Sequence, residues 1–263
     1  MSIQQEQEMI IDAFIFYNEL DLLTLRFAEL YDRVDWFVLV EATRTFRGDE
    51  KPLVFAENKD RYAQYLPKVI HVIVDDMPMH TDAWGREDHQ RNAIRKGIEI
   101  IQPPDDAVLI ISDADEIPDM GAIQTATIDR IYALEQDFYY YTPTWKHRER
   151  WLAARVLPIR VFRQHDSKAN HIRMGISSVP GIPYAGWHFS YFGDISFIRK
   201  KIESFSHQEF NFEMFKNPHH LEDCIQNGRD VFFRPDKPLV YIPIHSNPYL
   251  PRTLTTMYVT NKS

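Results

Sequence analysis

Three carboxylates follow one hydrophobic segment of the chain and are its strongest sign of chemistry. Residues 107–111 read Ala-Val-Leu-Ile-Ile, as expected of a buried parallel strand, and Ser112-Asp113-Ala114-Asp115-Glu116 follows directly. Carboxylates this close repel one another, and a divalent cation relieves the repulsion. Oxygen ligands suit Mg²⁺ or Mn²⁺, which can bridge two phosphates and stabilise a nucleoside diphosphate as it leaves. The alternative is a solvated acidic turn that caps the next helix.

Two other residues are candidates for the same site. His188 lies in Gly186-Trp187-His188-Phe189-Ser190, after a loop rich in proline and glycine. It can bind a metal or contact a phosphate, and a core histidine bonded to the backbone is the alternative. Arg91, in the predicted helix 87–101, can reach the strand ends and hold a phosphate or a sugar. Its alternative is an ordinary charged helix face, with Glu87 and Arg91 paired four residues apart.

The elements that position these residues follow from the hydrophobic pattern. In the first half of the chain, predicted strands alternate with predicted helices, which favours an α/β protein with a doubly wound, mostly parallel sheet flanked by helices. Ligands of such sheets bind beyond the carboxyl ends of the strands, where Asn18, Glu41 and the acidic run all fall. The predicted strands are 9–17, 36–40, 69–74 and 107–111, and the predicted helices are 20–30, 87–101 and 120–134.

The second half of the chain has a different pattern. Aromatic and β-branched residues predict longer strands at 138–145, 155–162 and 187–192. Glycine, proline and serine predict a loop at 175–186, and helices are expected at 195–205 and 219–227. No linker marks a boundary, so we expect a single domain over 1–263, in which the second half extends the same sheet.

The composition limits the class of protein. The 263 residues are 44% hydrophobic, enough for a sizeable core, and the net charge of −8 argues against a nucleic-acid-binding surface. The single cysteine, Cys224, excludes an intrachain disulfide and a cysteine-based metal site. Residues 1–9 are polar, unlike a signal peptide, and no segment approaches the ~18 apolar residues of a membrane span. We therefore expect a cytoplasmic protein without a transmembrane segment.

Taken together, these motifs resemble glycosyltransferase family 17. The resemblance covers roughly residues 12–248 and implies a GT-A-like fold, inversion at the anomeric carbon, a divalent metal and a UDP-sugar donor, with N-acetylglucosamine as the expected sugar. It is carried by DAFIFYNELDLL at 12–23, RFAEL at 26–30, VLVEA at 38–42 with TFRG at 45–48, Trp84 with Arg91, IISDADEIP at 110–118 and AGWHFS at 185–190.

The resemblance also implies roles for single residues. Residues 1–135 would bind the nucleotide sugar, and 136–263 would bind a glycan or glycolipid acceptor, with peripheral membrane association as an option. The implied metal ligands are Asp113, Asp115 and His188. The implied contacts to the nucleotide sugar are Asn18, Glu19, Glu41, Arg91 and Asp113.

A direct displacement also needs a base that takes the proton of the acceptor hydroxyl. Glu209 is the first candidate, because it follows the predicted helix 195–205 in a region where the family also keeps an acidic residue. Burial against Phe210 would raise its pKa toward a useful value, and a surface charge is the alternative. Asp194 and Glu116 are the next candidates.

Two other classes of protein share part of this pattern. A metal-dependent phosphohydrolase could also use an Asp-x-Asp pair at a strand end, but the expected Thr or Ser and Lys motifs do not follow the pair. A non-catalytic glycan-binding protein would explain the aromatic residues at 139–151 and not the carboxylates.

Overall fold

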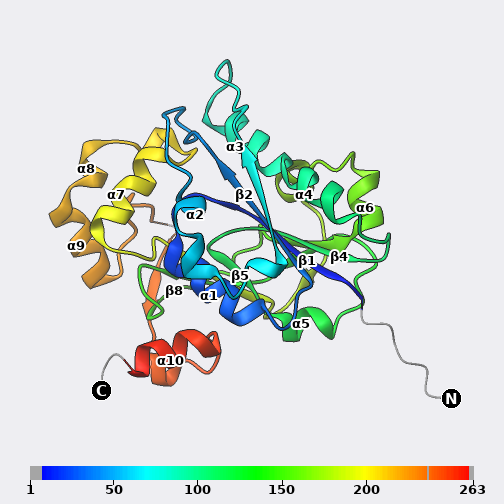
Figure 1. Ribbon diagram of the computed structural model, residues 1–263. Coiled ribbons are helices and arrows are strands. Elements are labelled where there is room, and N and C mark those ends of the chain that lie inside the picture. The colour runs from blue at the N-terminus through cyan, green and yellow to red at the C-terminus, as the bar shows by residue number, and fades with distance from the viewer. Residues whose placement is uncertain (1–7, 236, 261–263) are drawn as a thin grey trace.

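The computed structural model describes residues 8–235 and 237–260, so most of the polar N-terminal segment lies outside the described residues. At its centre is a seven-stranded sheet with the strand order β10-β6-β9-β4-β1-β2-β3. β9 runs antiparallel to β4 and β6, and the other pairs in this sheet are parallel. The predicted α/β fold with a mostly parallel, helix-flanked sheet is confirmed (Figure 1).

The elements of this sheet mostly follow the hydrophobic runs of the sequence. The strands are β1 (Ile10–Phe16), β2 (Trp36–Ala42), β3 (Val69–Val74), β4 (Val108–Asp113), β6 (Tyr132–Leu134), β9 (Arg155–Pro158) and β10 (Gly181–Ile182). The helices that follow or connect these strands are α1 (Leu20–Leu30), α2 (Val54–Glu57), α3 (Ala83–Asn92), α4 (Ile94–Ile101), α5 (Met120–Gln124) and α6 (Ile159–Gln164).

The second half of the chain does not simply extend this sheet. Of its strands, β9 and β10 join the large sheet, but β7, β8, β11 and β12 form a separate five-stranded sheet with β5, in the order β12-β8-β7-β11-β5. Its strands are β5 (Glu116–Pro118), β7 (Asp137–Tyr140), β8 (Trp145–His147), β11 (Gly186–Ser190) and β12 (Leu239–Tyr241). Figure 1 shows α7 (Ile195–Ser204), α8 (Glu213–Lys216) and α9 (Pro218–Asn227) together at one side of the molecule, and α10 (Arg252–Thr260) below them.

The large sheet separates two hydrophobic clusters, because successive side chains of a strand point to opposite faces. Phe14 of β1 packs with Phe27 of α1 in one cluster. Ile15, the next residue, packs with Ile94 and Ile98 of α4 in the other. The continuous apolar runs of the central strands are thus explained by burial on both faces.

Four predicted elements differ from the structure. The predicted strand 138–145 is two antiparallel strands, β7 and β8, because the chain turns between Tyr140 and Trp145. The predicted helix 120–134 ends at Gln124, since the β-branched segment that follows favours a helix poorly, and 132–134 form β6. The predicted strand 155–162 ends at Pro158, and α6 begins there with Ile159 and Phe162 buried three residues apart. The predicted helix 87–101 is two helices, α3 and α4, that meet at Ala93.

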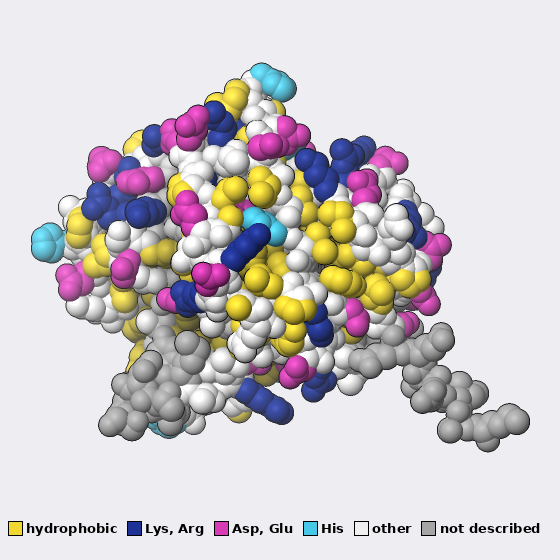
Figure 2. All heavy atoms as spheres, in the orientation of Figure 1, with side chains coloured by type: hydrophobic (Ala, Val, Ile, Leu, Met, Phe, Trp, Pro, Cys, Tyr) yellow, Lys and Arg dark blue, Asp and Glu magenta, His cyan; other side chains and the backbone are white. Residues whose placement is uncertain are grey.

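Figure 2 shows acidic and basic side chains interspersed over the visible face, with no continuous basic surface there. Within the described part of the chain, no helix is both long enough and apolar enough to cross a membrane.

Candidate active site

A pocket of about 320 Å³ lies beyond the carboxyl ends of β1 and β4. Its lining combines two kinds of side chain. Charged residues are Glu19, Glu87, Asp113, Asp115, Arg173 and Lys201, among others. Aromatic residues include Phe138, Tyr140, Trp151, Tyr191, Phe210 and Phe232. Both halves of the chain therefore contribute to one pocket.

Arg26 of α1 holds the backbone of the acidic turn, residues 113–116, which begins at the end of β4. The fully buried guanidinium donates to both carboxylate oxygens of Asp12 at 2.5 and 2.7 Å, and Asp12 is also fully buried, in the middle of β1. It also donates to Ser112 Oγ at 2.6 Å and to the carbonyl oxygens of Asp113 and Glu116 at 3.0 and 2.8 Å. The Arg26–Asp12 pair thus fixes the backbone that carries the three carboxylates.

Asp113 and Glu116 are neutralised by arginines. Arg91 and Arg173 each donate to one oxygen of Asp113 at 2.9 Å. Burial acts to raise the pKa of Asp113, but Arg173 and Arg91 outweigh it and lower the pKa. Arg173 also donates to both oxygens of Glu116, at 2.8 and 2.6 Å, and Trp151 Nε1 donates to Glu116 as well.

Asp115 has a different environment. Lys201 Nζ donates to its Oδ2 at 2.6 Å, and His188 Nε2 lies 3.6 Å from its Oδ1. Burial acts to raise the pKa of Asp115, yet Lys201 and His188 lower it well below its usual range. Asp115 is therefore ionised at neutral pH.

His188 reaches this position because Gly186 allows two strands to pair closely. Gly186 has a φ of 138°, and a Cβ there would lie 2.2 Å from the carbonyl oxygen of Ile117. β11 consequently pairs with β5, which places His188 opposite Glu116. The imidazole stacks on Phe138 with ring centroids 4.6 Å apart.

The side chains of Asp115 and His188 can be examined as ligands of a divalent cation. Asp115 Oδ1 and His188 Nε2 face each other at 3.6 Å, too far for a hydrogen bond, and a carboxylate oxygen with an imidazole suits Mn²⁺. Among the described residues no group of three or more His, Cys, Asp or Glu could hold a metal. Asp115 and His188 fit as two ligands, and diphosphate and water would complete the set, as is common for Mg²⁺.

Asp113 fits less well as a third ligand, because both its oxygens accept from arginines. The repulsion expected among the three carboxylates is relieved by Arg91, Arg173 and Lys201. Repulsion alone is thus no argument for a metal here, and the roles of the predicted ligands stay predictions.

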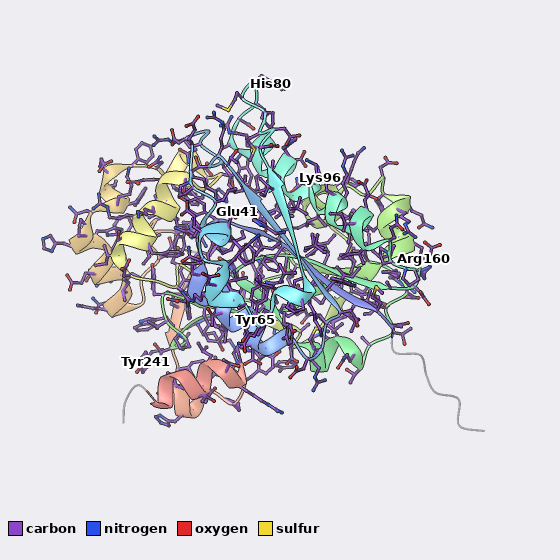
Figure 3. The ribbon with its side chains drawn as sticks, in the orientation of Figure 1. Glu41, Tyr65, His80, Lys96, Arg160 and Tyr241 are labelled. Carbon is purple, nitrogen blue, oxygen red and sulfur yellow. The ribbon has the colours of Figure 1, made fainter. Side chains whose placement is uncertain are left out.

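The structure separates the predicted nucleotide-sugar contacts. Glu19 and Asp113 line the pocket, whereas Asn18, Glu41 and Arg91 are absent from its lining among the described residues. Glu41 is fully buried beside α2, accepts from Phe55 N at 3.0 Å and lies 3.1 Å from His71 (Figure 3). Arg91 is only 1% exposed and forms ion pairs with Glu87 and Asp113. It therefore orients two carboxylates of the pocket lining.

The three candidate bases also lie in different places. Glu116 lines the pocket but is bonded to Arg173 and Trp151. The exposed side chain of Glu209 pairs with His207 Nδ1 at 2.7 Å, and Asp194 caps α7 through Phe197 N at 2.7 Å. Neither is part of the described pocket lining. A catalytic role for Glu209 or Asp194 stays a prediction, and the pocket geometry gives it no support.

Sequence reasoning missed three residues that shape the site: Arg26, Arg173 and Lys201. Arg26 carried a signal, since it falls among buried positions of an amphipathic helix and within the RFAEL motif. Arg173 and Lys201 follow the acidic run by 60 and 86 residues, and nothing in their local sequence marks them.

A search of protein-family models gives a match over residues 1–237, to the model described as glycosyltransferase family 17. The chain belongs to glycosyltransferase family 17. This confirms the family and the enzyme class expected from the sequence.

Two curated relatives carry the name beta-1,4-mannosyl-glycoprotein 4-beta-N-acetylglucosaminyltransferase. The rat protein is 26% identical over 273 residues, and the human protein is 26% identical over 256 residues. The matches cover 83% of this chain but 47% and 48% of those proteins, so the family 17 chain spans about half their length.

Among solved structures, the apo structure of the bifunctional glycosyltransferase WbbM is similar with a TM-score of 0.33 and 10% identity. That match covers 66% of this chain and 35% of the other chain. A likeness of this size carries no conclusion about the pocket.

Proposed function

We propose that this protein is an inverting, metal-dependent transferase that moves N-acetylglucosamine from UDP-N-acetylglucosamine to a glycan or glycolipid. The observation that carries the proposal is Asp115, held just after β4 between Lys201 and His188 in the lining of the pocket. The names of the curated relatives support the sugar, and the family supports the class of reaction.

The chain's own residues can bind and orient a nucleoside diphosphate sugar. Lys201 and Arg173 line the pocket and provide positive charge beside the acidic turn, where a diphosphate would otherwise be repelled. Burial acts to lower the pKa of Lys201, but Asp115 and Glu19 raise it, so the ammonium stays charged. A divalent ion held by Asp115 and His188 would supply further charge stabilisation for the leaving diphosphate.

The aromatic residues of the pocket lining are suited to sugars. Pyranose rings stack their C–H faces on aromatic side chains, and Trp151, Phe210 and Tyr191 are part of the lining. We therefore place the sugar rings against these side chains and the diphosphate of the donor beside Lys201 and Arg173.

The donor is tested with a panel of nucleotide sugars, with and without Mn²⁺. We expect UDP release to be fastest from UDP-N-acetylglucosamine, since the relatives' names point to that sugar. A clear preference for a GDP- or CMP-sugar would overturn the donor assignment. Release of inorganic phosphate would indicate a hydrolase, and binding of glycans without any release would indicate a non-catalytic glycan-binding protein.

Metal dependence can be measured without relying on activity alone. EDTA should abolish transfer, and Mn²⁺ or Mg²⁺ should restore it. In addition, UDP with Mn²⁺ at about 100 times its Kd should stabilise the fold by about 2.7 kcal/mol, which corresponds to a rise in Tm of about 5–10 °C. UDP alone should have a much smaller effect. An equal rise in Tm in EDTA, or full transfer in EDTA, would count against the metal.

A further inference from the structure

One carboxylate of the pocket differs from the others in its partners. Asp113, Asp115 and Glu116 each accept from an arginine or a lysine, and Glu87 accepts from Arg91 Nη2 at 2.6 Å. Among the described residues, Glu19 is the pocket carboxylate that has no cation within 4 Å. It is the acidic group that remains free to exchange a proton with a ligand.

The backbone at the end of β1 holds this carboxylate by one oxygen. Oε2 of Glu19 accepts from Tyr17 N and from Asn18 N, both at 3.0 Å. No hydrogen bond to Oε1 is recorded within the described part of the chain. Glu19 is half-buried and precedes the first turn of α1, so its position is fixed by rigid elements. One oxygen is therefore anchored while the other can face a ligand in the pocket.

The pocket imidazoles are poorer candidates for the same task. His188 is buried against Phe138 and Trp151, and its Nε2 faces Asp115. His207 is bonded through Nδ1 to Glu209 and packs edge-on against Trp84 with ring centroids 4.5 Å apart. In each ring, one nitrogen therefore faces a carboxylate of the protein itself, Asp115 for His188 and Glu209 for His207.

We infer that Glu19 is the general base of the transfer, an assignment that rests on the proposed function. Oε1 of Glu19 takes the proton of the acceptor hydroxyl while the acceptor oxygen forms its bond to the anomeric carbon. The bond from that carbon to the diphosphate oxygen breaks, and its electron pair leaves with the UDP. The products are the glycosylated acceptor, UDP and a protonated Glu19, which returns its proton to water.

The surroundings of Glu19 agree with this role. Burial raises the pKa of Glu19, which suits a group that must hold a proton after the transfer. Lys201 lowers this pKa and Asp115 raises it, and the net effect is a rise. The charged or titratable groups around it are Lys201 of α7, Asp115 after β4, Lys51 after β2 and Tyr17 at the end of β1. The transfer rate should fall as the pH drops through this raised pKa, because the protonated acid cannot accept a proton.

The test compares Glu19→Gln with wild type and with Asp21→Asn as a matched control. Asp21 lies in the first turn of α1, two residues away, but its side chain is 90% exposed and pairs with Arg61 outside the pocket. Glu19→Gln keeps the shape and the two backbone hydrogen bonds. We expect it to lower kcat by ~100-fold or more, the lower range for general-base catalysis, with the Kd for UDP and Mn²⁺ within twofold of wild type.

The acid limb of the pH–rate profile gives a second measurement on the same proteins. It should be present in wild type and in Asp21→Asn, and absent from the residual rate of Glu19→Gln. A Glu19→Gln protein that transfers at the wild-type rate, or that loses UDP affinity with kcat unchanged at saturating donor, would overturn the assignment and leave the proposed function standing. If wild type transfers no sugar from any donor, the proposed function itself fails, and the role of Glu19 fails with it.

Discussion

Arg26→Met should lower the free energy of unfolding by about 3–5 kcal/mol, the cost of leaving a buried charge without its partner. Asp12 is fully buried and its carboxylate accepts two hydrogen bonds from Arg26. Methionine fills much of the same space but donates nothing, so Asp12 would be charged and unpaired in the core. Urea denaturation of the variant and wild type measures the difference.

Arg33→Met is the matched control, because Arg33 is exposed just beyond α1 and its guanidinium donates to Gln124 on the surface. Its effect should stay within about 0.5 kcal/mol. Adding Asp12→Asn to Arg26→Met should recover part of the lost stability, since the unpaired charge is then gone. A loss below about 1 kcal/mol in Arg26→Met would show that the pair does not hold the core as we argue.

Asp115→Ala should lower the rate of sugar transfer by at least ~100-fold, the scale seen when one stabiliser of developing charge is removed. Its carboxylate orients Lys201 and faces His188, so the substitution disturbs both groups expected to act on the leaving diphosphate. The rate at saturating donor and the Kd for UDP with Mn²⁺ should both be measured. We expect weaker binding as well as slower transfer.

Asp106→Asn provides the control for this substitution. Asp106 is exposed and lies two residues before β4 begins at Val108, so it is at the end of the strand opposite the acidic turn. Transfer by this variant should match wild type. Near-normal transfer by Asp115→Ala would show that the acidic turn is not the centre of the reaction.

The sequence by itself determined the framework of the protein. Hydrophobic runs predicted β1, β2, β3 and β4 with small errors at their ends, because strands buried on both faces need continuous apolar residues. Helical spacing predicted α1 and α7 almost to the residue. The acidic run after β4 and the family motifs indicated a glycosyltransferase, which the family match confirms. These signals are local, so they can be read from a single sequence.

The tertiary structure alone decided which charges meet. Arg173 and Lys201 reach Asp113 and Asp115 only because the second half of the chain folds over the carboxyl ends of the strands. The same packing buries Glu41 away from the pocket, leaves Glu209 in solvent and, among the described residues, leaves Glu19 without an ion pair. The energy of an ion pair depends on the distance and the burial of its members, and spacing along the chain fixes neither of these for residues far apart in sequence.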